Sequence, residues 1–231
     1  MERVEDIRTE LGSRDWEALT AHEAIVWGHE RFGGQMVFAS SFSLEDVALI
    51  DMACAAGIKP RVFYLDTGVL FPETYELIGR IAERYGIAPE RVLPQLTLDE
   101  QAQVHGEKLW LREPDRCCGI RKVQPLRRYL AGQDAWVTGI HRDQSPTRAG
   151  APRVTYDEGF SLVKLNPIVD WTTEDVHSYI AERGVPYNPM HDQGYPSIGC
   201  MPCTRAVRPG EDPRSGRWAG FQKTECGLHG R

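Results

Sequence analysis

The chain has 231 residues, 41% of them apolar and 26% charged, and its 27 Lys and Arg against 33 Asp and Glu give a net charge of −6. These values are typical of a globular protein and exclude a disordered, collagen-like or coiled-coil chain. No stretch approaches the ~18 consecutive apolar residues of a membrane span, and no apolar leader region follows the charged start MERVEDIRTE. We therefore expect a cytoplasmic protein without a membrane partner.

The predicted elements alternate between short apolar strands and helices. After a helical N-terminal segment, strands are expected at residues 36–40, 61–66, 91–96, 135–140 and 160–167. Capping and proline signals predict helices at residues 44–56, 72–85, 118–130 and about 170–183. This alternation predicts an α/β fold, a mostly parallel sheet with helices on both faces, whose ligands bind at the carboxyl ends of the strands.

The chain is expected to have one main domain with an appendage at each end. Residues 1–35 are expected to form the helical N-terminal segment, and residues 36–184 are expected to form the α/β domain. Residues 185–231 are rich in Pro and Gly and show no clear periodicity. We expect them to form an irregular tail, not an independent domain.

Positive charge is concentrated in two parts of the chain. Residues 112–153 carry nine Lys or Arg against four Asp or Glu, a net charge of +5, and residues 196–231 carry six against three, a net charge of +3. Two basic segments on an acidic chain favour a small anionic ligand in a cleft, because nucleic acids are attracted by a positive whole domain. We therefore expect no nucleic-acid partner.

Four of the six cysteines form two clusters, Cys117-Cys118 and Cys200-x-x-Cys203. In a chain of this size without a secretion signal, such clusters indicate a metal site more than disulfides. Zinc is one candidate. Adjacent side chains on a helix point about 100° apart, which favours the separate iron corners of a 4Fe-4S cluster. Cys54 lies in an apolar helical run and is interpreted as a small buried residue.

Cys226 stands apart, in the closing run KTECGLHGR, with Lys223, His229 and Arg231 nearby. Positive neighbours lower the pKa of a thiol and raise its thiolate fraction, so Cys226 is a candidate nucleophile. The alternative is a cysteine without a chemical role near the end of the chain.

Several polar residues are candidates for anion or nucleotide binding. Ser40, Ser41 and Ser43 precede a predicted helix, where hydroxyl and backbone N–H groups can bind an anion, although Ser43 could simply cap the helix. Asp66 ends a strand and could hold a ribose or adenine edge, or belong to a turn. The cations best placed for a phosphate or sulfate are Lys122, Arg142, Arg214 and Arg217. The arginines expected on the surface are Arg121, Arg127, Arg128, Arg148 and Arg208.

The motifs together resemble the iron-sulfur branch of the APS/PAPS reductase family, the assimilatory adenylylsulfate (APS) reductases. The resemblance runs from about residue 36 to the C-terminus and rests on CCGIRKVQPL (117–126), LDTGVLFPETYEL (65–77), TGIHRDQSPTR (138–148), NPIVDWTTEDV (166–176), VPYNPMHDQGYPSIGCMPCTR (185–205) and ECGLH (225–229). It implies an adenine nucleotide alpha hydrolase fold, in which SFSLED is a modified PP-loop. Residues 36–184 would then be the nucleotide-binding α/β domain, and residues 185–231 a catalytic tail anchored by a metal cluster.

The resemblance also implies roles for the candidate residues. One 4Fe-4S cluster per subunit is held by Cys117, Cys118, Cys200 and Cys203, and Cys226 is the nucleophile. Lys122 lies beside the cluster and the substrate, and the phosphosulfate is bound by Arg142, Arg214 and Arg217. The residues near the nucleotide are Ser40, Ser41, Ser43 and Asp66, and His229 assists at the same site. His141 and His177 stand where the family often has Arg and Trp, and we expect the second change to affect only packing.

The implied activity is that of an oxidoreductase of sulfate assimilation and cysteine biosynthesis. It reduces APS to sulfite and AMP through an S-sulfonate on Cys226. No second C-x-x-C remains and the chain ends five residues after Cys226, so thioredoxin, or glutaredoxin, is expected as the electron donor. A homo-oligomer is compatible with the sequence. The alternatives are a PAPS reductase, a zinc-stapled nucleotide-binding PP-loop protein, and a tRNA-thiolating PP-loop enzyme that consumes ATP.

Overall fold

A single six-stranded sheet forms the centre of the protein in a computed structural model that describes residues 2–223 and 225–228. The strands follow the order β3-β2-β1-β4-β6-β5, and all neighbours pair in parallel except β5, which is antiparallel to β6. Their bounds are β1 Met36–Ala39, β2 Arg61–Leu65, β3 Glu90–Val92, β4 Ala135–Val137, β5 Val154–Asp157 and β6 Leu162–Leu165. The expected α/β fold with a mostly parallel sheet is confirmed.

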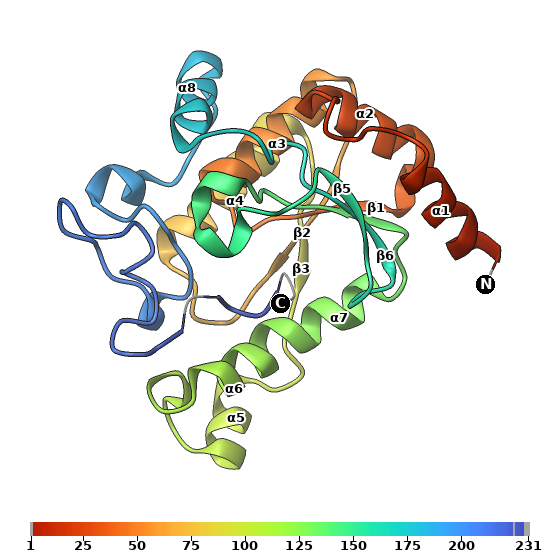
Figure 1. Cartoon of the computed structure of the whole chain (residues 1–231). Coiled ribbons are helices and arrows are strands. Elements are labelled where there is room, and N and C mark those ends of the chain that lie inside the picture. The colour runs from red at the N-terminus through yellow and green to blue at the C-terminus, as the bar shows by residue number, and fades with distance from the viewer. Residues whose placement is uncertain (1, 224, 229–231) are drawn as a thin grey trace.

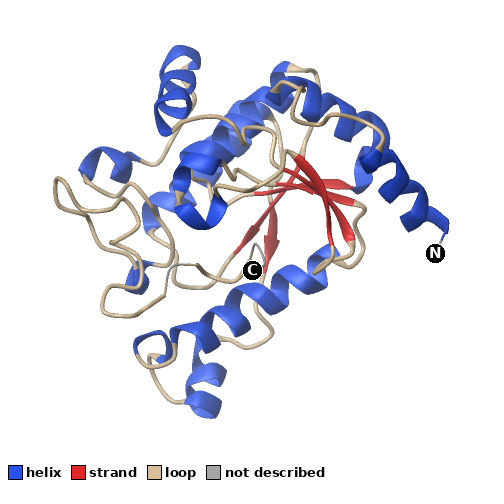
Figure 2. Cartoon of the chain, in the orientation of Figure 1, coloured by secondary structure: helices blue, strands red, loops and turns tan. Residues whose placement is uncertain are grey.

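Helices cover both faces of this sheet (Figures 1 and 2). Their bounds are α1 Glu2–Gly12, α2 Ala21–Phe32, α3 Leu44–Ala55, α4 Pro72–Tyr85, α5 Leu98–His105, α6 Pro114–Cys118, α7 Gln124–Leu130 and α8 Thr173–Arg183. Single 3₁₀ turns are formed by Gly33–Gln35, Leu109–Leu111, Arg142–Gln144, Pro146–Arg148, Pro189–Gln193 and Met201–Cys203. No helix of the described residues has the length and apolar character needed to span a membrane.

Alternate residues of the strands point to two different hydrophobic clusters. Phe38 of β1 belongs to the larger cluster, to which α1, α2, α3, α4 and α8 contribute. Val37, the residue before it, belongs to the smaller cluster with Leu126 and Leu130 of α7. The strands are thus buried on both faces, as expected for a parallel sheet whose strands are continuous apolar runs.

Residues 114–130 form one continuous helical run in which α6 and α7 are joined by a π-helical turn, Gly119–Val123. A π turn inserts one extra residue into the helix and changes the direction of the side chains before it. Cys117 and Cys118 end α6 directly before this turn, and Lys122 lies within it. The irregularity therefore positions three of the predicted site residues.

The chain order creates a switch point beside β1. From β1 the chain runs outward through β2 and β3, then returns to β4 on the other side of β1. Ligands of open α/β sheets bind outside the carboxyl ends of the strands at such a point. Beyond α8 the described chain has 3₁₀ turns and two isolated bridges, Leu70 with Cys200 and Thr204 with Arg217. The division at residues 35 and 184 remains a prediction.

Candidate active site

A cavity of about 370 Å³ opens at the carboxyl ends of β1 and β4. Several distant parts of the chain contribute to its walls, among them residues 40–46 after β1, residues 138–148 after β4, residues 196–199, and residues of the segment 213–228. The predicted residues that line it are Ser40, Ser41, Ser43, Lys122, Arg214, Arg217 and Cys226. Folding thus brings together most of the candidate site from distant segments.

The loop at residues 40–43 turns the chain from β1 into α3. Phe42 has a left-handed backbone, with φ of 59°, and its side chain is buried against Tyr64 at a ring-centroid distance of 5.9 Å. The Ser40 hydroxyl accepts a hydrogen bond from the Phe42 N–H at 3.0 Å, and Ser43 caps α3. Ser41 donates to Asp46 Oδ2 through its N–H at 2.6 Å and its hydroxyl at 2.9 Å.

Two carboxylates begin α3 at the wall of the cavity. Burial, together with the charge of Glu45, raises the pKa of Asp46 to about 6. Burial also opposes ionisation of Glu45, but hydrogen bonds from His141, Ser43 and Gln144 lower its pKa to about 2. The Gln144 amide donates to Glu45 Oε1 at 2.7 Å. Neither carboxylate was among the predicted site residues, because acidic residues in a first helical turn usually only complement the helix dipole.

Arg148 lines the cavity, although the sequence placed it on the surface. It ends the turn Pro146–Arg148, and its side chain is only 14% exposed. Two of its nitrogens, Nε and Nη2, donate to the two carboxylate oxygens of Glu225, each at 3.1 Å. Arg214 Nη2 donates to Glu225 Oε2 at 3.2 Å. Two arginines from distant segments therefore meet on one carboxylate.

Arg142 lies outside the set of residues that line the cavity. Its Nη2 donates to Glu17 Oε2 at 2.7 Å and its Nε to the Ala151 carbonyl at 3.0 Å. The preceding residue, His141, is buried and its Nε2 lies 3.3 Å from Glu45 Oε1. Because neighbouring residues of an extended segment point in opposite directions, His141 takes the inward position and Arg142 the outward one. His177, expected only to pack, lines the cavity.

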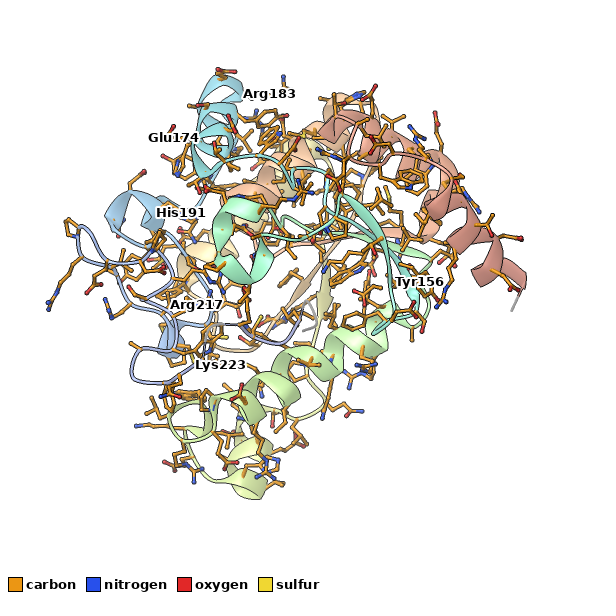
Figure 3. The ribbon with its side chains drawn as sticks, in the orientation of Figure 1. Tyr156, Glu174, Arg183, His191, Arg217 and Lys223 are labelled. Atoms are coloured by element: carbon orange, nitrogen blue, oxygen red, sulfur yellow. The ribbon has the colours of Figure 1, made fainter. Side chains whose placement is uncertain are left out.

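Lys122 lies between the large cavity and a second, smaller pocket, and it lines both. Burial disfavours its charge, but the thiols of Cys200 and Cys226 raise the pKa of Lys122. Arg217 donates to the Ser197 hydroxyl at 3.2 Å, and its guanidinium lies 4.6 Å from the centre of the Trp218 ring. Figure 3 shows Arg217 on the C-terminal segment. Cys226 is half-buried in the wall of the cavity.

The smaller pocket is lined by all four cysteines of the two clusters. Their thiols are free, without disulfides. Cys200 is held beside the loop after β2, where the Thr67 hydroxyl lies 3.3 Å from its sulfur and Met201 N–H donates to the Val69 carbonyl at 2.8 Å. Burial and the charges of the neighbouring thiols raise the pKa of Cys117 to about 11 and of Cys203 to about 12.

The four thiols of the smaller pocket are the candidate donor set for a metal group. Among the described residues, no group of three or more Cys, His, Asp or Glu side chains is arranged to hold a metal ion. Four thiols in one pocket are nevertheless a soft donor set suited to zinc or to an iron-sulfur cluster. A single zinc ion would need the sulfurs to converge, whereas the iron atoms of a cluster are separate. The thiol donor set suits either of these two metal groups.

Arg121 also differs from the expectation of a surface residue. It is 4% exposed and donates to the carbonyls of Thr67 and Leu96 and to Gln101 Oε1. Burial lowers the pKa of its guanidinium, while nearby Cys117 and Cys200 oppose this effect. Arg121 therefore fastens the cysteine pocket to the loop after β2, a role that no local pattern in the sequence indicates.

Asp66 makes hydrogen bonds within the protein and does not line the cavity. It is buried and accepts hydrogen bonds from the Gly68 N–H at 2.8 Å, the Tyr75 hydroxyl at 2.7 Å and Arg91 Nε at 2.6 Å. These bonds hold the turn at Gly68, whose φ is 74°. Asp66 is not among the residues that line the cavity. His229, predicted to assist at the site, lies outside the described residues.

Residues 35–206 match the model of the phosphoadenosine phosphosulfate reductase domain. The chain belongs to this reductase family. A member named adenosine 5'-phosphosulfate reductase 1, from Bacillus subtilis (strain 168), is 49% identical over 210 residues, which cover 90% of each chain. An adenosine 5'-phosphosulfate reductase from Geobacillus thermodenitrificans (strain NG80-2) is 42% identical over 231 residues, 99% of this chain and 97% of the relative.

Solved structures agree with this membership of the reductase family. The phosphoadenylyl-sulfate (PAPS) reductase from Candida auris, in a phosphate complex, has a TM-score of 0.72 at 27% identity, covering 90% of this chain and 97% of its own. Candida glabrata FMN adenylyltransferase has a TM-score of 0.61 at 13% identity, covering 89% and 72%, and shares the fold alone. The resemblance stated from the motifs is confirmed.

Proposed function

We propose that the protein is a cytoplasmic APS reductase of sulfate assimilation and cysteine biosynthesis. The observation that carries the proposal is the position of Cys226 in a cavity that also holds Lys122, Arg148, Arg214 and Arg217. A nucleophilic thiolate and an anionic sulfur repel each other unless nearby cations offset the charge. The names of the relatives supply the substrate class, an adenosine 5'-phosphosulfate.

The proposed reaction has two displacement steps at sulfur. The Cys226 thiolate attacks the sulfate sulfur of APS, a bond forms between the two sulfurs, and the bond from sulfur to the phosphate oxygen breaks. AMP leaves with that electron pair. A thiolate of an external dithiol then attacks Cys226 Sγ, sulfite leaves with the electron pair of the sulfur–sulfur bond, and Cys226 is left in a mixed disulfide. The second thiol of the reductant closes its own disulfide and releases Cys226.

Replacement of the nucleophile tests this mechanism directly. In Cys226→Ser we expect sulfite release from APS to be lost and no S-sulfonate to be found on the Cys226 peptide by mass spectrometry. The matched control is Cys54→Ser, because Cys54 lies on α3 and does not line the cavity. A Cys226→Ser protein that still releases sulfite contradicts the proposal.

The second part of the proposal is a 4Fe-4S cluster held by Cys117, Cys118, Cys200 and Cys203. It is supported by the shared pocket of the four free thiols and by the adjacent positions of Cys117 and Cys118 on α6, where neighbouring side chains point about 100° apart. The cluster would supply local charge beside Lys122 and tie residues 200–203 to α6. Protein purified without oxygen should be brown and contain about four iron atoms per chain. A colourless protein with one zinc ion would instead support the zinc-stapled alternative.

The third part concerns the electron donor and the choice of substrate. Once four cysteines serve the cluster, Cys54 is the only other one besides Cys226, and it is remote from the cavity wall. The second displacement step, in which a dithiol attacks Cys226, therefore needs an external donor, thioredoxin or glutaredoxin. Steady-state assays with each donor, and with APS and PAPS at equal concentration, test both points. Preference for PAPS would contradict the proposed substrate, and turnover without a donor would contradict the second step.

A further inference from the structure

Glu225, the residue before Cys226, lies between two arginines of the cavity. Arg148 contacts both carboxylate oxygens, and Arg214 contacts one of them at 3.2 Å. The Thr147 hydroxyl lies 3.4 Å from the same carboxylate. All three charged residues line the cavity, and the side chains of the two arginines are 14% and 20% exposed. We name the pair Arg148 and Arg214 the arginine clamp.

The geometry of this contact is that of an anion site with its ligand in place. Two parallel N–H···O bonds from one guanidinium to two oxygens are the arrangement by which Arg binds carboxylate, phosphate and sulfate alike. Burial lowers the pKa of Arg214, and the charge of Glu225 opposes that effect. The clamp is thus short of solvent and stabilised by an anion, the Glu225 carboxylate of the tail itself.

We propose that Glu225 is an internal anion that occupies the arginine clamp when the cavity holds no substrate and yields it to the phosphosulfate of APS. This rests on the proposed function. No bond is made or broken in the exchange, because one anion replaces another on the same two guanidinium groups. Glu225 therefore competes with the substrate for the two guanidinium groups of the clamp.

The segment around Glu225 can move at small cost. Among the described residues from 222 onward, none takes part in a backbone–backbone hydrogen bond with another described residue. Glu225 is 28% exposed, so its carboxylate reaches water without crossing a packed core. Both arginines keep an anionic partner when the phosphosulfate replaces the carboxylate, so the exchange leaves no buried charge unpaired.

Two other contacts keep Cys226 near the cavity while Glu225 moves. Lys223, only 7% exposed, pairs with Asp115 of α6, and its Nζ lies 5.3 Å from the centre of the Trp218 ring. Figure 3 shows Lys223 on the C-terminal segment near the helical run of α6. On the other side, Leu228 packs against the smaller hydrophobic cluster. The exchange is thus confined to the short stretch between these two anchors.

The test measures binding without turnover, in a Cys226→Ser background. Calorimetric titration with APS should give a Kd about 3- to 10-fold lower in Glu225→Gln than in its parent, because the amide competes poorly for two guanidinium groups. Glu225→Asp keeps the charge and should stay closer to the parent. The matched control is Glu211→Gln, which removes the partner of Arg205 at 2.9 Å outside the cavity wall and should leave Kd unchanged.

Titration with inorganic sulfate separates this inference from the proposed function. Tighter sulfate binding in Glu225→Gln, even if APS is not bound, supports the exchange at the clamp and counts against APS as substrate. APS binding with the same or a weaker affinity in Glu225→Gln than in the parent overturns the inference and leaves the proposed function standing. An equal gain in affinity in Glu211→Gln also overturns it, because the effect would then be general to the tail.

Discussion

Arg142 and Arg148 lie six residues apart, yet they face different surroundings. Arg142 pairs with Glu17 beside the N-terminal helices, and Arg148 enters the cavity. Both are preceded by polar residues and both are arginines, so the residue types do not distinguish them. The direction of each side chain depends on two successive 3₁₀ turns, Arg142–Gln144 and Pro146–Arg148, which no periodic pattern predicts.

The first prediction compares these two arginines. Arg148→Ala should lower kcat/KM for APS about 10- to 100-fold, because it removes charge-assisted hydrogen bonds in a partly buried cavity. Arg142→Ala should change kcat/KM by less than about threefold, since its ion pair lies at the surface. Steady-state sulfite release measures both. The opposite ranking would return Arg142 to the substrate site.

Gly139 allows the end of β4 to lie close to the start of α3. A Cβ atom at this position would lie 2.6 Å from Asp46 Oδ1 and 2.8 Å from Glu45 Cβ. Gly139→Ala should therefore lower the free energy of unfolding by about 1–3 kcal/mol, the usual cost of overpacking, and weaken APS binding. Denaturant unfolding and titration calorimetry measure the two effects.

The control for this prediction is Gly79→Ala. Gly79 lies inside α4, and a Cβ there would meet nothing within 4 Å. Replacement of a helical Gly by Ala should raise stability by about 0.5–1 kcal/mol. Equal destabilisation by the two substitutions would show that Gly139 is not required for the close approach of β4 and α3.

At the level of elements, long segments with a clear hydrophobic period were predicted correctly, whereas short and mostly polar elements were not. The helix Pro72–Tyr85 has proline at its start and a clear amphipathic period, and its expected bounds agree with the structure. Strand β5, Val154–Asp157, was not predicted, because it lies at the sheet edge and only Val154 is buried. The helix α5 was not predicted either, although Thr97 and Glu100 form a capping box that could have indicated it.

The cysteine clusters show what spacing can and cannot establish. Two pairs of thiols predicted a shared site, and all four line one pocket. The positions of the arginines were predicted less accurately than those of the cysteines. Arg121 and Arg148 are held inside the protein by contacts with Thr67 and Glu225, which lie far away in sequence. Long-range contacts of this kind leave no local signal.

Three helices meet on Asp51, a buried residue of α3. Its carboxylate accepts hydrogen bonds from the Tyr85 hydroxyl of α4 at 2.9 Å and the Tyr179 hydroxyl of α8 at 2.7 Å, and it pairs with Arg183. Burial opposes ionisation, but the bonds from Tyr179, Arg183 and Tyr85 lower the pKa of Asp51 below its ordinary value. Asp51 therefore joins α3, α4 and α8 on the same side of the sheet.

The prediction for this cluster has a defined pH dependence. Asp51→Asn should lower the free energy of unfolding by about 1–3 kcal/mol at pH 7. Because the folded pKa is lowered, the contribution of Asp51 is present above its unfolded pKa of about 3.9 and is lost as the pH falls through the folded pKa. The difference between the two proteins should therefore shrink toward acid pH. Glu174→Gln, an exposed site on α8, is the control.

At the scale of the whole molecule, net charge and local charge have opposite signs. The chain carries −6 overall, yet its two basic segments, residues 112–153 and 196–231, supply the cations of the cavity. They are more than 40 residues apart in sequence and are brought together only when residues 196–228 fold against the ends of the strands. The cavity can thus attract an anion that the average charge of the protein repels.

The approach of the substrate can be governed by the positive charge of the cavity or by the negative net charge of the whole protein, and the salt dependence of kcat/KM distinguishes the two. If the cavity dominates, kcat/KM for APS should fall about 3- to 10-fold as ionic strength rises from about 0.01 to about 0.15 M, since screening shortens the Debye length from about 30 to about 8 Å. The value of kcat should change less, because contacts inside the cavity are screened weakly. In Arg148→Ala the salt dependence should be shallower. In Arg31→Ala, which breaks a surface pair with Glu10 and a contact with the Phe32 ring, it should match the parent. A rise of kcat/KM with added salt would show instead that the net charge of −6 controls the encounter.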